Sequence, residues 1–210
     1  QGAIESKEGL LPKTDLETLG QISVAGLIGQ YEKALTFDSE VMAERCIDGV
    51  EFSTGSLGHG LSVATGMALS GKISKSSFRT YALLSDGECN EGSVWEAVMM
   101  AAAQKVDNLM VFVDFNKWQA TGRSRDVLAL DPLADKWRSF GWDVMEVDGH
   151  VHQELYDGMT KIRDTTKPRM IIAHTVKGKG VSFMEDDNNW HYRTPTEDEV
   201  NAAKIELGVS

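Results

Sequence analysis

The chain has 210 residues, of which 41% are hydrophobic and 25% are charged. This length suits one ordinary α/β domain, and the composition is typical of a packed globular protein and excludes a disordered one. A formal charge of -11, with no block of Lys or Arg, argues against nucleic acid and against an anionic membrane surface as the main partner.

The cysteine spacing and the start of the chain favour a cytoplasmic protein. Cys46 and Cys89 show neither CxxC nor Cys/His spacing, so neither a disulfide framework nor a zinc site is indicated. No apolar run approaches the roughly 20 residues that span a bilayer, and Gln1 opens onto a charged stretch in place of a signal peptide. The absence of an initial Met suggests that the helical N-terminal part, 1–48, is truncated.

Helical spacing and short apolar runs alternate along most of the chain. Helices are predicted at 14–23, 29–44, 58–71, 93–105, 132–140 and 152–163, with a capped closing helix at 195–208, and strands at 80–84, 109–113, 143–147 and 170–173. This order predicts an α/β fold with a doubly wound, mostly parallel sheet flanked by helices, as a single domain over 1–210.

Two oxygen-bearing side chains follow neighbouring predicted strands. Asp86 comes after the strand at 80–84, and Asn116 follows the strand at 109–113, 30 residues later (116 minus 86). That spacing is one strand–helix–strand unit, which places equivalent strand ends side by side. A hard cation such as Mg²⁺ could bridge the two oxygens there and share its remaining positions with a phosphate group. Gly87 would let an anion approach the backbone. Taken singly, each motif also fits a turn or a helix cap.

A Gly-rich loop, Thr54-Gly-Ser-Leu-Gly-His-Gly60, leads into a helix of small and apolar residues. Its backbone would pack closely on a flat ligand or on a phosphate near the start of the helix, although such a loop alone is weak evidence.

Together these motifs resemble the thiamine diphosphate-binding half of the transketolase family, most closely the separate amino-terminal subunit of split transketolases. The resemblance runs from about Gly49 to Gly208. It rests on the Gly-rich loop, then Ser85-Asp-Gly-Glu-Cys-Asn-Glu-Gly-Ser-Val-Trp-Glu-Ala97, Asp114-Phe-Asn-Lys-Trp-Gln119, Pro132-Leu-Ala-Asp-Lys-Trp137, Val147-Asp-Gly-His150, Thr175-Val-Lys-Gly-Lys-Gly-Val-Ser-Phe-Met-Glu185 and Trp190-His-Tyr-Arg193.

The resemblance implies roles for the residues at the two strand ends. Asp86 and Asn116, with the backbone carbonyl of Trp118, would ligate Mg²⁺. Gly87 would contact the diphosphate of the cofactor, and Glu88 belongs to the same cofactor-binding segment.

It also implies that Leu57, with the backbone of Gly55, Ser56 and Gly58, packs on the aminopyrimidine ring of the cofactor. The competing interpretation of Leu57 is an ordinary core leucine.

Further roles fall on a lysine and on the histidines. By the resemblance Lys177 would neutralise diphosphate charge and His191 would face the reacting carbonyl, with His59 as the second catalytic candidate. Lys177 could instead be solvated, His191 could be a buried structural residue, and His59 could serve to hydrogen-bond the loop. His150 and His174 look structural, although spacing alone does not exclude them from proton transfer.

The function implied is transfer of a two-carbon ketol unit between sugar or sugar phosphate substrates, with thiamine diphosphate and Mg²⁺ as cofactors. The glutamate that activates the cofactor in this family belongs to a pyrimidine-binding domain that has no counterpart here. A separate pyrimidine-binding subunit is therefore implied, in a heterotetramer, and this chain alone would be inactive. Glu91 and Glu96 would lie at the subunit contact, or else would be ordinary exposed helix charges.

Two departures from the family pattern leave other readings open. The transketolase family has a Ser-Lys-Gly-His-Ala segment and a His-Pro motif before the Gly-rich loop, and neither has a match in this sequence. Ser85 also replaces the Gly that usually precedes the metal-binding Asp. The alternatives are a deoxyxylulose phosphate synthase-like or 2-oxo acid decarboxylase-like enzyme, and a non-catalytic scaffold subunit.

Overall fold

The centre of the protein is a four-stranded parallel sheet with the strand order β1-β2-β6-β5. The computed structural model describes residues 50–52, 55–161 and 166–209. The strands are β1 (Thr80–Ser85), β2 (Leu109–Phe115), β5 (Asp143–Asp148) and β6 (Arg169–His174). The helices predicted at 14–23 and 29–44 lie outside the described residues.

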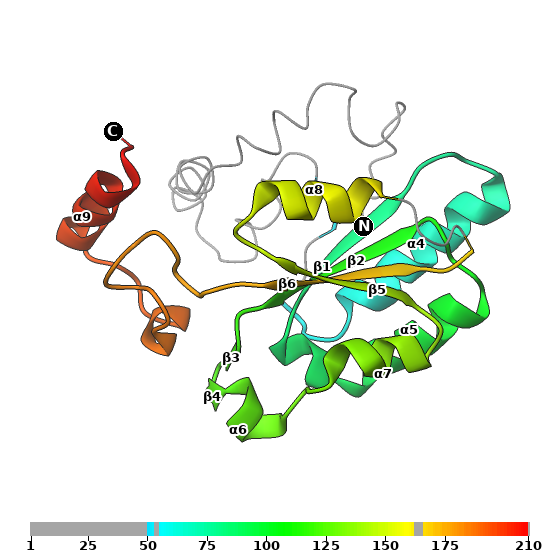
Figure 1. Ribbon diagram of the computed structural model, residues 1–210, viewed down its shortest axis with the longest axis horizontal. Helices are drawn as coiled ribbons and strands as arrows, with labels where there is room; N and C mark the ends of the chain where they lie inside the picture. Colours follow the sequence, from blue (N-terminus) through cyan, green and yellow to red (C-terminus); the bar gives the residue numbers. More distant parts are fainter. Residues whose placement is uncertain (1–49, 53–54, 162–165, 210) are drawn as a thin grey trace.

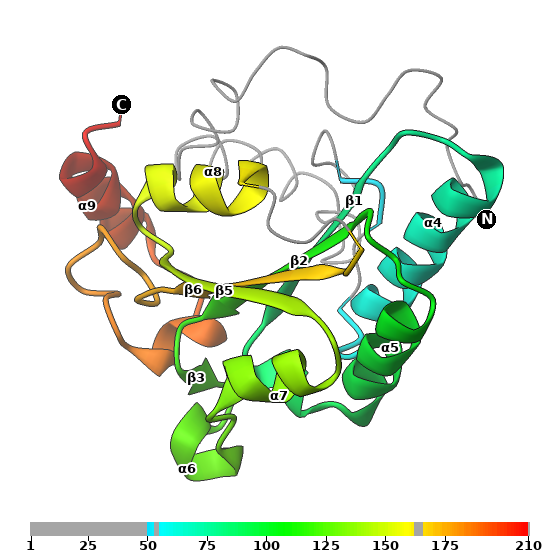
Figure 2. The same ribbon diagram turned by 45° about the vertical axis from the view of Figure 1, so that its right-hand side comes forward.

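Helices cover both faces of the sheet, which confirms the predicted fold class. The helices α4 (Gly60–Ser74), α5 (Gly92–Ala103) and α7 (Leu133–Ser139) lie on one face, and α8 (His152–Thr160) lies on the other (Figures 1 and 2). Each of these helices was predicted from its spacing, with ends that differ from the observed ones by up to three residues (163 minus 160 at the end of α8).

The alternation of side chains along β2 explains why both faces need cover. Val111 and Val113 point into the larger core, which α4, α5 and α7 build, whereas Met110 belongs to the smaller core beneath α8. Successive side chains of a strand point to opposite faces, so an uninterrupted apolar run produces two buried faces. The sequence of this strand is therefore sufficient to predict its central place in the sheet.

Two strand–helix–strand units, β1–α5–β2 and β5–α8–β6, bring the carboxyl ends of all four strands to one edge of the sheet. Several short elements gather there, none of them predicted. They are η2 (Gly87–Asn90), the hairpin of β3 (Trp118–Gln119) and β4 (Gly122–Arg123), α6 (Ser124–Leu128) and η3 (Asn188–His191). Figure 1 shows the hairpin and the segment leading to the last helix on the side where β2 and β6 end.

The closing helix predicted at 195–208 coincides with α9 (Glu197–Leu207). Thr196 and Glu199 form a capping box at its start, and Gly208 ends it in the left-handed conformation with φ 65°. Among the described helices, none is both long enough and apolar enough to cross a membrane.

Two core tryptophans give a test of the packing. Trp137 and Trp142 lie edge to face with their ring centroids 4.8 Å apart. The indole nitrogen of Trp142 donates to the carbonyl of Val98 at 2.9 Å, whereas that of Trp137 is buried without a hydrogen-bond partner among the described residues.

We expect Trp142→Phe to reduce the free energy of unfolding by about 1 kcal/mol more than Trp137→Phe, because only the former breaks a buried hydrogen bond. Trp137→Ala should cost about 3–5 kcal/mol through the cavity that it leaves. Urea denaturation at 25 °C measures all three variants. Equal losses for the two Phe variants would contradict the assigned hydrogen bonding.

Candidate functional site at the carboxyl edge of the sheet

The ends of β1 and β2 are joined through the carboxylate of Asp86. Its Oδ2 accepts a hydrogen bond from the backbone N–H of Lys117 at 2.8 Å, and its own N–H donates to the carbonyl of Asp114 at 3.2 Å. Lys117 directly follows Asn116, so the turn that carries Asn116 lies against Asp86. The predicted side-by-side placement of the two strand ends is therefore observed.

Asp86 is completely buried and accepts three hydrogen bonds in all. The other two come from Gly87 N–H to Oδ1 at 2.9 Å and from Ser124 Oγ to Oδ2 at 2.8 Å. A carboxylate offers about four lone-pair positions, which leaves one on Oδ1 for a further ligand. Desolvation raises the pKa of Asp86 and nearby Asp114 adds to the rise, while the hydrogen bonds from Ser124, Gly87 and Lys117 oppose it.

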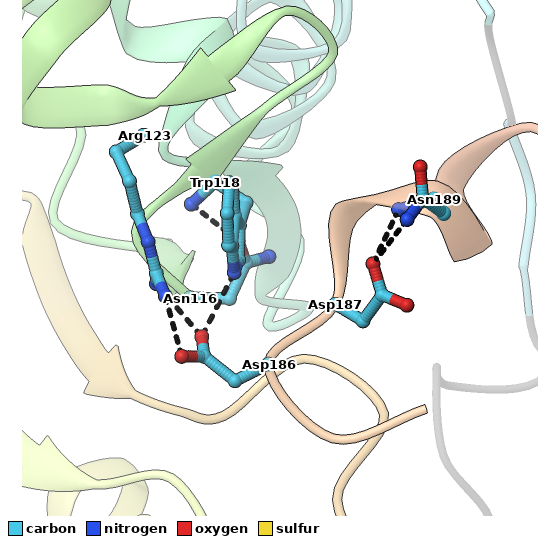
Figure 3. Close-up of polar contacts among 6 residues, drawn as sticks. All are labelled: Asn116, Trp118, Arg123, Asp186, Asp187 and Asn189. Carbon is cyan, nitrogen blue, oxygen red and sulfur yellow. Dashed lines mark hydrogen bonds and ion pairs between the residues drawn. The ribbon is translucent and has the colours of Figure 1, made fainter. Parts of the chain in front are cut away.

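Asn116 is held by the residues on either side of it. Its Nδ2 donates to Asp114 Oδ2 at 3.0 Å. Its Oδ1 accepts from the backbone N–H of Trp118 at 2.9 Å, and Figure 3 shows this second bond. The other carboxylate oxygen of Asp114 accepts from the hydroxyl of Thr175. The amide oxygen of Asn116 has a second lone pair, so it can also serve as a ligand.

The oxygen atoms at these two strand ends are suitable ligands for a hard cation. One buried carboxylate oxygen, one amide oxygen and a backbone carbonyl match the oxygen ligands that Mg²⁺ shares with phosphate groups. A cation beside Asp86 would also offset the electrostatic cost of burying its charge. Among the described residues no group of three or more His, Cys, Asp or Glu could hold a metal, so the predicted set, with its single carboxylate, stays a prediction.

The Gly-rich loop is fastened to the segment that follows Asp86. The N–H of Gly58 donates to Glu88 Oε1 at 2.9 Å, and its carbonyl accepts from Ser93 Oγ at 2.8 Å. Gly58 has φ +84°, and a Cβ there would lie 2.4 Å from Ser93 Oγ and 2.8 Å from Cβ of Glu91. Only glycine fits this position without strain. Glu88, predicted to bind cofactor, serves here to hold the loop.

The side chain of Leu57 is 53% exposed, which rules out the interpretation of Leu57 as a core leucine. Gly55 and Ser56 beside it are exposed as well. His59 is also exposed, and its Nδ1 lies 3.1 Å from the carbonyl of Leu57. His59 therefore fits the loop hydrogen-bonding role, and an apolar side chain is left at the surface next to the segment of Asp86.

The loop after β6 carries Lys177 and leads to His191. Lys177 is half-buried, and its carbonyl accepts from the N–H of Asp186 at 2.8 Å. His191 is exposed at the end of η3, so it is not a buried structural histidine. Asn188 Nδ2 donates to the carbonyl of Gln119 at 2.9 Å, which brings η3 against the β3–β4 hairpin.

The two histidines expected to be structural have structural contacts. His150 Nε2 accepts from the N–H of Val176 at 2.8 Å, and His174 Nε2 lies 2.9 Å from Glu146 Oε2. They line an open hollow of about 410 Å³ at the ends of β5 and β6. Glu91 and Glu96 are both exposed, as either an interface or a solvated helix face would require.

The sequence interpretation missed a cluster built from Trp118, Arg123 and Asp186. Asp186 accepts two hydrogen bonds from the guanidinium of Arg123, and Arg123 stacks on the ring of Trp118 (Figure 3). Gln119 pairs with Gly122 across a two-residue hairpin loop, and that Gly was the available signal in the sequence. No pattern in the sequence connects Asp186 to this hairpin.

In a comparison with known proteins, one family model matches most of the chain. The model, described as "Transketolase, thiamine diphosphate binding domain", matches residues 39–210. The chain is 39% identical over 195 residues to a Phocaeicola vulgatus protein named as a subunit of apulose-4-phosphate transketolase, a match that covers 91% of this chain. It is 42% identical over 160 residues to a Clostridium protein named as a subunit of 6-deoxy-6-sulfo-D-fructose transketolase, a match that covers 76% of this chain.

This chain spans 68% of the length of the Phocaeicola protein and 58% of the Clostridium protein. Among solved structures, a transketolase from Campylobacter jejuni matches with a TM-score of 0.72 and 28% identity, over 77% of this chain and 27% of that one. The R525L mutant of Pichia stipitis transketolase matches with a TM-score of 0.75 and 24% identity, over 87% of this chain and 29% of that one, which shows the fold alone.

A glycine pair tests the fastening of the loop. Gly58→Ala should lower the free energy of unfolding by about 2 kcal/mol or more, because the new Cβ meets two side chains at a positive φ. Gly66→Ala is the matched control, since a Cβ at this helical position meets nothing within 4 Å. It should stabilise the protein by about 0.5–1 kcal/mol. Denaturant titration decides, and similar effects of the two substitutions would refute the proposed fit.

Proposed function

The chain belongs to the transketolase family, and from that premise we propose that it is the diphosphate-binding subunit of a thiamine diphosphate- and Mg²⁺-dependent transketolase. The chain would form a single domain. Together with its partner subunit it would transfer a two-carbon ketol unit between sugar or sugar phosphate substrates. The observation that carries the proposal is the junction of the two strand ends, where Asp86 accepts from the N–H of Lys117 at 2.8 Å.

The proposed metal ligands are Asp86 Oδ1, the side-chain oxygen of Asn116 and the carbonyl of Trp118. The lone pair left on Oδ1 supports a role for Asp86 as a ligand through one oxygen. Gly87 follows directly, where the backbone can approach a diphosphate closely. A metal at this edge would hold the diphosphate, since Mg²⁺ is commonly shared between carboxylate and phosphate oxygens.

The remaining residues would orient the cofactor and substrate. Thiamine diphosphate, when bound, supplies the nucleophilic carbon that breaks the carbon–carbon bond next to a ketose carbonyl. The exposed side chain of Leu57 would pack on the flat pyrimidine ring, and Lys177 would balance diphosphate charge. His191, exposed at the end of η3, would donate or accept a proton at the substrate carbonyl.

The proposed partner is a separate pyrimidine-binding subunit. The Phocaeicola and Clostridium relatives are both named as single subunits of transketolases, which supports a site divided between two chains. Glu91 and Glu96, both exposed, would face the second chain in a heterotetramer. The substrate names of these relatives, a ketose phosphate and a sulfo-sugar, support a substrate with an anionic group remote from the reacting carbonyl.

Asp86 gives the test of the proposed function. Asp86→Asn keeps the size of the side chain and removes its charge, so we expect the Kd for thiamine diphosphate in the presence of Mg²⁺ to rise at least ~100-fold, about 2.7 kcal/mol. Calorimetric titration with and without Mg²⁺ measures this change. Asp148→Asn is the matched control, because this exposed residue ends β5 and no site role is proposed for it.

Thermal denaturation must show that the Asp86→Asn chain is folded. Unchanged, Mg²⁺-dependent binding by a folded variant would exclude the metal assignment. Ketol transfer is expected only in the presence of the pyrimidine-binding subunit, and transfer by the purified chain alone would contradict the division of the site.

Leu57 tests the proposed cofactor surface separately. Leu57→Ala should weaken binding of thiamine diphosphate about tenfold, because it removes apolar surface that the ligand would bury. The free energy of unfolding should stay within about 0.5 kcal/mol of wild type, since the side chain is already exposed. Ile73→Ala, at a 75% exposed position near the far end of α4, is the control and should change neither quantity. A loss of stability without a change in Kd would contradict the proposed cofactor surface.

A further inference from the structure

We propose that Asp186 is a positioning residue that ties the loop carrying Lys177 to the turn carrying Trp118, so that the two sides of the diphosphate site are held as one unit. The inference rests on the proposed function, in which the Trp118 carbonyl is a metal ligand and Lys177 faces the diphosphate. The segment 177–186 is called the Lys177 loop below.

The side chain of Asp186 binds the β3–β4 hairpin through three hydrogen bonds, and this set of contacts is called the grip. Arg123 donates from Nη1 to Oδ1 at 2.7 Å and from Nη2 to Oδ2 at 2.5 Å, and Trp118 Nε1 donates to Oδ1 at 2.8 Å (Figure 3). The guanidinium of Arg123 also lies 3.7 Å from the centre of the Trp118 ring. The planar guanidinium of Arg123, stacked on the ring of Trp118, fixes the orientation of the Asp186 carboxylate as well as its distance from the hairpin.

The backbone of the same residue closes the Lys177 loop. The N–H of Asp186 donates to the carbonyl of Lys177 at 2.8 Å, and Asp186 has a left-handed φ of 58°. Asp and Asn tolerate this conformation better than most residues. One residue therefore joins both ends of the loop to each other and the loop to the hairpin.

Contacts within the Lys177 loop and between the loop and α9 would let the loop transmit this constraint. Gly178 has φ +71°, and a Cβ there would lie 2.4 Å from the carbonyl oxygen of Met184. The backbone segments at the two ends of the loop are therefore in close contact. Ser182 donates to both carboxylate oxygens of Glu206 on α9, at 2.5 Å from its N–H and 2.7 Å from its hydroxyl. The loop is thus fastened to α9 at its tip and to the hairpin at its base.

The grip is better suited to positioning than to folding. The side chains of Arg123 and Asp186 are 31% and 50% exposed, and exposed ion pairs contribute little to the stability of a fold. Ordering two loops before a ligand arrives, by contrast, removes an entropic cost from binding. Loss of the Asp186 carboxylate should therefore affect ligand binding and local motion more than global stability.

The test compares Asp186→Asn with Asp135→Asn in the full chain. Asn can keep the left-handed backbone at 186, so the first variant removes mainly the charge of the grip. Asp135 forms an exposed ion pair with Arg138 at 2.9 Å, both on α7, and serves as the control.

Hydrogen exchange measured by mass spectrometry should show at least tenfold faster exchange over 176–190 in Asp186→Asn without ligand, and unchanged exchange in α5 and α8. The Kd for thiamine diphosphate with Mg²⁺ should rise about tenfold. Arg123→Ala should produce the same changes, and the double variant should be no worse than either single one, because the two residues act as a unit. The control should match wild type in both measurements.

Each outcome decides the proposal. Unchanged exchange over 176–190, or faster exchange throughout the chain, overturns it, because the first shows no grip and the second shows a purely structural role. Faster local exchange with an unchanged Kd also overturns the positioning role. If wild type binds no thiamine diphosphate, the proposed function fails, and the exchange of the ligand-free variants still decides whether Asp186 holds the loop.

Discussion

The organisation of the whole edge depends on one buried carboxylate. Asp86 directly follows β1 yet accepts a hydrogen bond from the backbone beyond β2, and Ser124, at the start of α6, donates to the same oxygen. Burial of a charged group is tolerated because each bond comes from a group that itself needs a partner. The position of Asp86 is therefore fixed by three segments of the chain at once, and Asn116 is held in the adjoining turn by Asp114 and Trp118. A ligand at this edge would meet oxygens that are already in place.

Around this carboxylate the chain is fastened in successive steps. Glu88, two residues after Asp86, holds the Gly-rich loop through Gly58, and Trp118, two residues after Asn116, holds the Lys177 loop through Asp186. Each strand end thus supplies one group to the candidate site and, within two residues, one anchor for a neighbouring loop. The regular sheet defines where the loops begin, and these anchors define where they lie.

The predictable parts of the molecule are those governed by local rules. The apolar runs of β2 and β6 predicted the sheet, and a crossover of ordinary length predicted that Asp86 and Asn116 would be neighbours. The hairpin escaped prediction because strands of two residues have no period to detect. The pairing of Arg123 with Asp186 joins residues 63 positions apart, and a long-range ion pair leaves no local pattern. Exposure was equally invisible, since a leucine at position 57 suits a core or a ligand surface.

The distribution of exposure gives the strongest argument about how the site is completed. The groups that hold the edge together, Asp86 and Ser124, are buried, whereas Leu57 and His191 lie open at the surface. Small-molecule sites usually bury most of their ligand against apolar walls, so the exposure of Leu57 among the described residues agrees with the proposed second subunit. Glu91 is open as well, within contact of the loop that carries Leu57. The second subunit of the proposed function would cover Leu57 and Glu91, and a ligand would then lie between that subunit and the edge of the sheet that Asp86 holds in place.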